Sequence, residues 1–262
     1  MITPEDIKNL IDDFILNYKD KNAIITDWAD PIVGFASTDD SLFLQLKQVI
    51  DQDHKHPNQL LPSAKTVISY FVPFNENIVQ SNIDGKLASK EWAIAYIETN
   101  KLITDINKFL TAEIKQENYD SFEIPPTHNF DENKLVSYWS HKHIAYIAGL
   151  GKFGLHKMLI TEKGCCGRLG SLIISAKIEA TGRNEDEYCL YFFNKTCKQC
   201  LDKCLFNALY LNSFDRHKCY KICLENGRIY SKLGLSDICG KCACGIPCSV
   251  NNPVKLIGKY KY

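Results

Sequence analysis

Ten cysteines lie close together in the second half of the chain and offer its most evident chemistry. The densest run is CKQCLDKC at 197–204, and a second Cys-x2-Cys pair follows near residue 240. The series is Cys189, Cys197, Cys200, Cys204, Cys219, Cys223, Cys239, Cys242, Cys244 and Cys248. Thiolates at these spacings indicate metal binding or redox chemistry in a reducing compartment and disulfides in an oxidising one.

Disulfides and structural zinc explain this pattern less well than iron–sulfur clusters do. The N-terminus, MITPEDIKNL, has neither the basic region nor the apolar core of a signal peptide, so we expect a cytoplasmic protein with reduced thiols. One four-thiolate zinc site would use the two Cys-x2-Cys pairs and leave the other six cysteines without a role. Spacings such as Cys200-x3-Cys204 are also not typical of zinc knuckles.

The run at 197–204 matches the later part of the two-cluster ferredoxin pattern C-x2-C-x2-C-x3-C-P, whose last cysteine binds the other cluster. Asn194 occupies the position of the first cysteine in that pattern, and Leu205 replaces the proline. We therefore expect Cys189, at the start of the cysteine-rich region, to supply the missing ligand. Eight thiolates then hold two [4Fe–4S] clusters that relay electrons.

We choose a ligand assignment in which each cluster draws on both halves of the region, as the crossing ligand of two-cluster ferredoxins requires. The first set is predicted to be Cys189, Cys197, Cys200 and Cys248. The second set is predicted to be Cys204, Cys219, Cys239 and Cys242. Cys223 and Cys244 remain as buried small apolar residues, or as replacements for Cys189 or Cys248.

The rest of the chain predicts an α+β fold. Thr3 and Pro4 mark a helix start, Ser89 to about Gln116 reads as a long amphipathic helix, and 138–148 as a shorter one. Strands are expected at 66–74, 121–126, 156–161 and 171–180, with EKGCCGRLG as the turn between the last two. The polar segment 181–187 is the best linker, which predicts an N-terminal domain of residues 1–182 and a small ferredoxin-like domain of residues 183–262.

A glycine-rich loop, AGLGKFG, precedes the expected strand at 156–161. It contains Gly149, Leu150, Gly151 and Gly154 in a GxGxxG pattern, but it follows a helix and leads into a strand, which is the reverse of a dinucleotide-binding fingerprint. Two interpretations stay open. The glycines either end a helix in a tight turn or leave bare backbone against which a large cofactor lies.

Other reactive side chains carry weaker signals. Cys165 and Cys166 lie in the expected turn and read as incidental, since nothing nearby marks them as activated. His141 and His143 are two residues apart and do not share a helix face, so a joint metal site is not expected. His156, just past the glycine loop, is a candidate to line a pocket there.

The composition narrows the set of partners. The chain has 262 residues with 31 Lys+Arg and 31 Asp+Glu, so it has no overall positive charge with which to hold a nucleic acid. Its sequence contains no apolar run of the length that spans a membrane, and no membrane partner is expected.

Together these features resemble the epoxyqueuosine reductase family, cobalamin-dependent enzymes related to reductive dehalogenases. AGLGKFG is similar to the family's AGLGWIGK loop, LGSLIIS resembles its LGEILT strand, and CLDKC followed by NAL looks like its cysteine run and helix. DRHKC ends at Cys219, whose position resembles that of the family's single cysteine between the two cysteine runs. The resemblance covers roughly residues 60–250.

The resemblance implies a nitroreductase-like α/β N-terminal domain that holds a corrinoid against the glycine loop. It also implies two adjacent clusters that receive electrons from a ferredoxin or flavodoxin. The family's aspartate proton donor would fall near Leu135, so no catalytic acid is assigned. With this departure, no net charge and an end soon after the cysteines, we expect a small-molecule substrate rather than tRNA. The alternative is a non-catalytic electron carrier without cobalamin.

Overall fold

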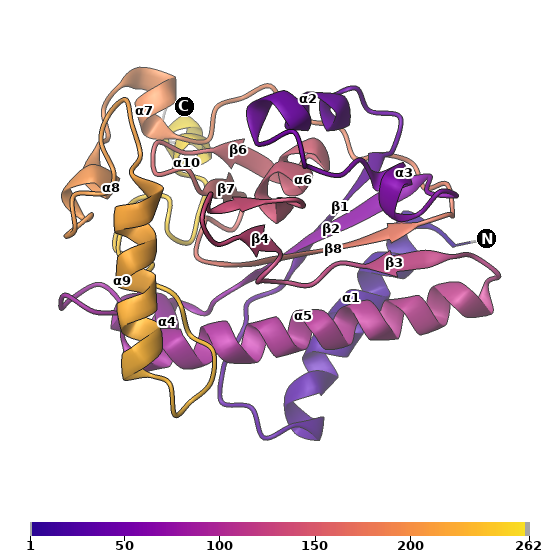
Figure 1. Ribbon diagram of the computed structural model, residues 1–262, viewed down its shortest axis with the longest axis horizontal. Helices are drawn as coiled ribbons and strands as arrows, with labels where there is room; N and C mark the ends of the chain where they lie inside the picture. The colour runs from indigo at the N-terminus through magenta and orange to yellow at the C-terminus, as the bar shows by residue number, and fades with distance from the viewer. Residues whose placement is uncertain (1, 260–262) are drawn as a thin grey trace.

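The computed structural model describes residues 2–259, which form layers of helices on both sides of one antiparallel sheet (Figure 1). The sheet has the strand order β1-β2-β8-β3. Its strands are β1 (Ile32–Ser37), β2 (Thr66–Pro73), β3 (Ser121–Glu123) and β8 (Gly167–Ile174). The α+β class predicted from the sequence is confirmed.

Strand β2 is the centre of the fold. All eight residues of TVISYFVP are buried, because helices cover both faces of the sheet. On one face α1 (Pro4–Lys21) and α5 (Lys90–Gln116) pack on side chains such as Ile68 and Tyr70. On the other face α2 (Leu42–Val49) and α6 (His141–Ile147) pack on Val67.

Both predicted helix starts are confirmed. The Thr3 hydroxyl accepts a hydrogen bond from the Asp6 backbone N–H, and the Asp6 carboxylate accepts from the Thr3 N–H, which forms a capping box in front of Pro4. The Ser89 hydroxyl likewise caps the N-terminus of α5 through the Trp92 N–H at 3.1 Å.

The predicted pairing of 156–161 with 171–180 is wrong. Strand β7 (Leu159–Thr161) pairs with β6 (Gly151–Phe153), whereas β8 pairs with β2 and β3 and already begins at Gly167. Gly170 lies opposite Tyr70, and a Cβ on it would come within 2.3 Å of the Tyr70 ring. The glycine that suggested a turn is therefore a strand residue that makes room for a large cross-strand side chain.

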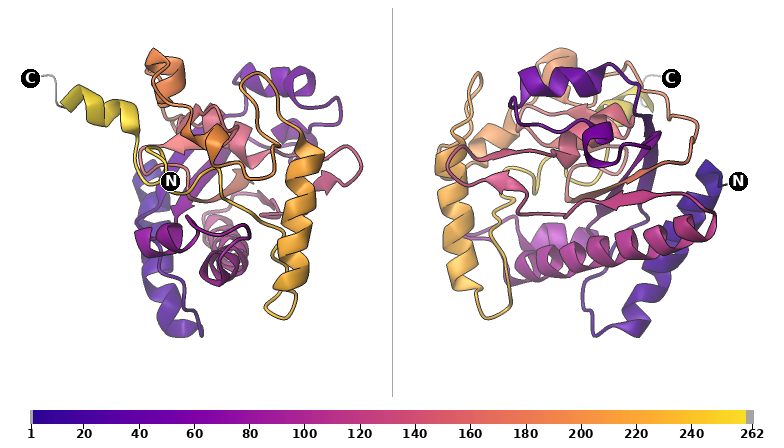
Figure 2. Two further views of the ribbon diagram at one scale, coloured as in Figure 1. Left: turned by 90° about the vertical axis from the view of Figure 1, so that its left-hand side faces the viewer. Right: turned by 45° about the vertical axis from the view of Figure 1, so that its right-hand side comes forward.

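Short elements complete the N-terminal part of the chain. They are α3 (Pro57–Leu60), α4 (Glu76–Ser81), β4 (Phe130–Asp131) and β5 (Val136–Ser137). The cysteine-rich part contains α7 (Leu190–Asn194), α8 (Gln199–Asp202), α9 (Arg216–Ile229) and α10 (Pro253–Lys259), joined by long loops. Helices α7, α8 and α9 lie along one side of the molecule (Figure 2).

The segment 181–187 is exposed and has no helix or strand, as a linker would be. One hydrophobic cluster nevertheless joins the two parts of the chain, since Trp92 and Tyr96 of α5 pack in it together with Cys200 and Cys244. The division at 182/183 stays a prediction, and the two parts share a core. Within residues 2–259, no helix has the length and apolar character needed to cross a membrane.

Candidate metal centre

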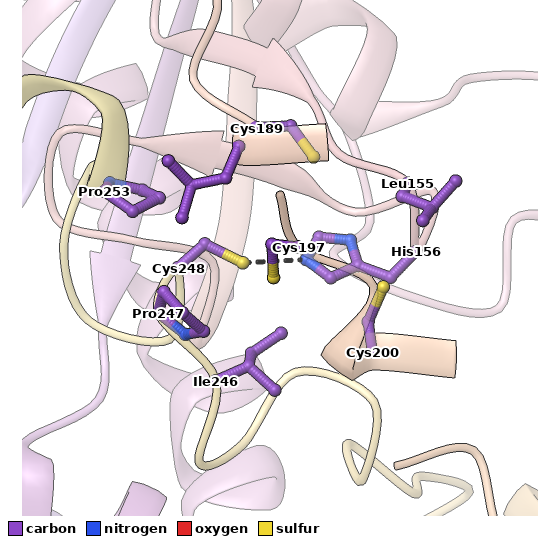
Figure 3. Close-up of a pocket in the computed structure, with 10 residues that line it drawn as sticks. Leu155, His156, Cys189, Cys197, Cys200, Ile246, Pro247, Cys248 and Pro253 are labelled. Carbon is purple, nitrogen blue, oxygen red and sulfur yellow. Dashed lines mark hydrogen bonds between the residues drawn. The ribbon is translucent and has the colours of Figure 1, made fainter. Parts of the chain in front are cut away.

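Four cysteines point into one cavity in the cysteine-rich part (Figure 3). They are Cys189, Cys197, Cys200 and Cys248, the four residues predicted as the first ligand set. His156, Ile246 and Pro247 also line this cavity. The fold thus brings together thiols from both ends of the region, and four sulfur ligands around one space suit a cubane cluster.

Local structure explains how each thiol reaches the cavity. Cys189 is the N-cap of α7, and Cys200 lies in the single turn of α8. Asn194 stands at the first cysteine position of the ferredoxin pattern. Its side-chain oxygen accepts hydrogen bonds from the backbone N–H and the hydroxyl of Thr196 and so caps a local turn instead. Cys189 approaches from the other end of the same short helix.

Cys248 is held in position by the turn between β7 and β8. The Cys165 N–H donates to the Cys248 and Ser249 carbonyl oxygens at 3.0 and 3.1 Å, and the Cys166 N–H donates to the Ser249 oxygen at 3.0 Å. The hydroxyl of Ser249 closes the loop by donating to Ala243 and Ile246. The last cysteine of the chain is therefore fixed by the N-terminal part.

The second predicted set, Cys204, Cys219, Cys239 and Cys242, also comes together. Burial raises the pKa of the Cys242 thiol, and charge on Cys219, Cys239 and Cys204 raises it further, so these thiols lie within electrostatic range of Cys242. Cys200 acts on the same thiol, so the two groups of cysteines adjoin each other. Adjacent groups of this kind suit electron transfer from one cluster to the next.

The roles of the two spare cysteines stay open. Cys223 follows Cys219 by one turn of α9, and the two side chains are within hydrogen-bonding distance of each other, so Cys223 lies beside the second group. Cys244 is fully buried, and its sulfur lies 4.0 Å from that of Cys166. Cys244 thus fits the expectation of a buried small apolar residue, whereas Cys223 is only half-buried.

Burial makes these thiols poor acids. It raises the pKa of Cys200 to about 12, with a further contribution from charge on Cys248, Cys189 and Cys197. It also raises the pKa of Cys239 to about 11. Such thiols stay protonated at neutral pH unless a bound cation stabilises the thiolates. The four thiols that line one cavity supply the sulfur donors that a soft metal centre uses.

Cys165 and Cys166, which the sequence suggested to be incidental, lie beside this centre. Both are buried, and the Cys166 thiol donates to the Ala243 carbonyl oxygen at 3.2 Å. The Cys165 sulfur, the Cys248 sulfur and a ring nitrogen of His156 all lie within 4.8 Å of one another. No sequence signal revealed this, because Ala243 and Cys248 are some eighty residues away along the chain.

The glycine loop is packed against its own chain. Gly149 follows α6 with φ of 76°, and a Cβ there would come within 2.6 Å of the Gly182 carbonyl oxygen. A Cβ on Gly151 would come within 2.0 Å of the Ile160 oxygen, and one on Gly154 within 2.7 Å of the His156 ring. Leu150 is buried against Phe71 and Leu159. The loop thus ends a helix and opens a strand, and its glycine pattern alone does not form a cradle for a corrinoid.

The two histidines of α6 do not form a metal site. The ring of His141 bonds the Pro125 carbonyl oxygen and the Ser171 hydroxyl through its two nitrogens. Nδ1 of His143 bonds the Ser140 hydroxyl, and its ring lies 4.8 Å from that of Phe153. Their different partners agree with the expectation that residues two apart on a helix face different ways.

Similar folds occur in solved structures of two kinds of reductase. No family model matches the sequence, and no curated protein matches it. Among solved structures, epoxyqueuosine reductase from Streptococcus thermophilus aligns at a TM-score of 0.56 with 20% identity over 91% of this chain. The Bacillus subtilis enzyme, in a structure with its catalytic loop swung out of the active site, aligns at 0.54 with 17% identity over 94% of this chain.

A second group of similar structures contains the catabolic reductive dehalogenase NpRdhA, which aligns at a TM-score of 0.59 with 15% identity over 87% of this chain. The chain spans 66% and 67% of the two epoxyqueuosine reductases and 31% of the dehalogenase. The chain therefore has an epoxyqueuosine reductase-like fold, which confirms at the level of fold the resemblance noted in the sequence. Identities of 20% and below establish the fold alone.

Proposed function

We propose that this protein is an iron–sulfur oxidoreductase. A ferredoxin-like C-terminal part holds two [4Fe–4S] clusters, and they relay electrons to a nitroreductase-like N-terminal part. The observation that carries the proposal is the cavity lined by Cys189, Cys197, Cys200 and Cys248, beside a second group of four cysteines. Cubane clusters transfer single electrons, and their potentials depend on burial and on hydrogen bonds to sulfur.

The chain's own contribution is to exclude water and to fix the sulfur ligands. Ile246 and Pro247 cover the first cavity with apolar surface, and the turn at Cys165 and Cys166 fixes the loop that carries Cys248. The Asn82 side chain fixes the Cys239 carbonyl oxygen in the second group. Ligands held in this way need little rearrangement when an electron arrives.

Metal and sulfide analysis of anaerobically reconstituted protein tests this function. Two cubanes require about eight iron per chain, whereas a zinc protein would hold one or two zinc ions. Cys200→Ser and Cys242→Ser should each remove one of two electron paramagnetic resonance (EPR) signals of the reduced protein. Cys166→Ser, outside both ligand sets, should keep both signals. Zinc without iron, or a spectrum unchanged in both ligand variants, would exclude the proposal.

Only the family resemblance suggests that the protein binds cobalamin. It would supply a metal centre for two-electron reduction of a substrate. The glycine contacts described above do not indicate a corrinoid by themselves, because the chain itself fills the Cβ positions of Gly149, Gly151 and Gly154; the alternative is an electron-transfer protein without a corrinoid. Anaerobic titration with cob(II)alamin separates the two. A base-off cobalt EPR signal saturating near one per chain supports the reductase, and no binding with both clusters intact supports the carrier.

The electron donor would be a small acidic protein of the ferredoxin or flavodoxin type. Residues 189–221 carry six basic side chains and two acidic ones, although the whole chain is neutral. The basic residues are Lys195, Lys198, Lys203, Arg216, Lys218 and Lys221. Phe192 and Phe193 of α7 and Leu205, which follows α8, are large apolar residues exposed within the same stretch of sequence. Exposed apolar residues and an excess of basic residues in the segment that carries the cysteines suit such a donor.

The substrate would be a small molecule rather than tRNA. The chain lacks an acidic residue at the position of the family's proton donor, where Leu135 stands with φ of 52° in the turn between β4 and β5. A cytoplasmic location, where thiols stay reduced, is part of the same proposal.

A further inference from the structure

The ring of His156 is enclosed between the glycine loop and the first group of cysteines. The residue is only 4% exposed, so its polar atoms have little access to water. Its Nε2 lies 3.4 Å from the sulfur of Cys248, and the ring points into the cavity that the four cysteines line (Figure 3).

The opposite side of the ring determines which nitrogen carries the proton. The backbone N–H of Met158 donates to Nδ1 at 3.1 Å, so Nδ1 must present its lone pair. A neutral imidazole then carries its hydrogen on Nε2. This hydrogen is directed at Cys248, and an N–H group donates readily to a thiolate.

The same tautomer excludes a different use of this residue. His156, Cys165 and Cys248 are close enough to bind one metal ion between them. A histidine that binds a metal through Nε2 normally donates its Nδ1–H to a carbonyl or carboxylate oxygen. Here Nδ1 faces an N–H donor instead, so metal binding through Nε2 would require the ring to lose its only proton.

Gly154 provides the space for this ring. A Cβ at residue 154 would lie 2.7 Å from Cε1 and 3.1 Å from Nδ1 of His156, so any other residue would displace the imidazole. The last glycine of the GxGxxG pattern thereby gains a role that requires no bound nucleotide or corrinoid. It allows the ring to approach Cys248.

We propose that His156 is a positioning residue for the first cluster, which donates its Nε2–H to the Cys248 thiolate and is seated by Gly154. The inference rests on the proposed function, because it requires a cluster on Cys248. Reduction adds negative charge to the cluster sulfurs, and a hydrogen bond stabilises the reduced form more than the oxidised form. The bond therefore raises the reduction potential of the first cluster.

An EPR-monitored redox titration of the reconstituted protein measures this effect. His156→Leu should lower the reduction equilibrium constant of the first cluster about tenfold, which is ~59 mV for a one-electron couple. His156→Gln keeps an N–H donor near the Nε2 position and should restore much of the potential. Gly154→Ala should shift the potential in the same direction as His156→Leu. His143→Gln, whose ring bonds Ser140 instead, is the control and should leave it unchanged.

A measurement on the wild-type protein keeps the test informative if a variant loses its cluster. Protein labelled with ¹⁵N-histidine should show one weak ¹⁵N coupling to the reduced first cluster in pulsed EPR, as expected across a hydrogen bond. A strong coupling of a direct iron ligand, or no coupling, overturns the inference while the proposed function stands. Equal reduction potentials of the first cluster in the wild type and in His156→Leu would also overturn the inference and leave the proposed function standing. If the wild type forms no cluster, both fail.

Discussion

The side-chain amide of Asn82 joins the end of α4 to two of the cysteines. Its Nδ2 donates to the Cys239 carbonyl oxygen at 2.9 Å and to the Cys244 sulfur at 3.4 Å. Its Oδ1 accepts from the Ser89 N–H at 3.0 Å, the residue that caps α5. Asn82 is fully buried, so each of these partners depends on it. One side chain thus couples the start of the longest helix to the second group of cysteines.

Asn82→Ala should therefore lower both stability and cluster occupancy. The Cys239 oxygen and the Ser89 N–H lose their buried partner, which costs about 1–3 kcal/mol of unfolding free energy. Urea unfolding measures the loss, and iron analysis should show the second cluster depleted before the first. Asn77→Ala, at an exposed position of α4, is the matched control. Equal stability of the two variants would contradict this role for Asn82.

Two glycines with the same backbone conformation test how the glycine loop is closed. Gly149 and Gly85 have φ of 76° and 78°, but only Gly149 has a neighbour where a Cβ would be added. Gly85→Ala should cost only the conformational strain of about 1–2 kcal/mol. Gly149→Ala should cost clearly more in thermal or urea unfolding, since the added carbon meets the Gly182 oxygen. Similar losses of unfolding free energy in Gly85→Ala and Gly149→Ala would show that the backbone around Gly182 moves aside freely.

His54 should make stability depend on pH. Burial lowers its pKa from 6.5 to about 4, and it accepts a hydrogen bond from the Ser140 N–H through Nε2. The pKa of His54 is lower in the folded state than in the unfolded state. Its contribution to the free energy of unfolding is therefore fully present above pH 6.5 and is lost as the pH falls toward 4. Between pH 6.5 and 5 the loss is about 2 kcal/mol. Urea unfolding of wild type and His54→Gln at both pH values should differ by that amount; parallel curves would contradict it.

The basic side chains of residues 189–221 should control the rate at which the donor protein reduces the clusters. Lys195→Glu combined with Lys221→Glu should lower the second-order rate constant with an acidic ferredoxin about tenfold or more at low salt. The effect should shrink as ionic strength rises. Lys47→Glu combined with Lys115→Glu, on α2 and at the far end of α5, is the control. If the first pair instead abolished RNA binding and left the rate unchanged, these side chains would belong to a nucleic-acid surface.

Cys219 and Cys223 can be distinguished by substitution. Both lie on α9 one turn apart, and the prediction assigns the ligand to Cys219. Cys219→Ser should abolish the EPR signal of the second cluster, and Cys223→Ser should keep it with a shifted potential. The reverse result would move the ligand to Cys223 and leave the two-cluster proposal intact.

Sequence patterns predicted the parts of this fold that depend on local interactions. The helix from Ser89 to Gln116 is evident because its apolar residues recur on one face and its cap is a serine. The strand at 66–74 is evident because it is continuously apolar and ends at a proline. The start of β8 was not evident, because Gly167 and Gly170 resemble turn residues until Pro73 and Tyr70 of β2 are known to lie opposite them.

The candidate metal centre was predictable only in part. Cysteine order alone suggested that Cys248 joins Cys189 and Cys197, and the fold brings these three to one cavity. The contributions of Cys165 and His156 depend on the packing of β7 and the following turn against a distant loop. Neither spacing nor composition carries that information, because it arises from tertiary contacts between segments far apart in sequence.

The backbone bonds from Cys165 and Cys166 to the loop of Cys248 have a consequence for maturation of the protein. The turn that donates them leads into β8, so the position of the last thiol of the first set depends on the central sheet. If the proposed clusters form, iron loading should therefore depend on the folding of the whole chain rather than of the cysteine-rich part alone. A chain with a defective sheet would stay unmetallated, and its exposed thiols would mark it for oxidation or proteolysis.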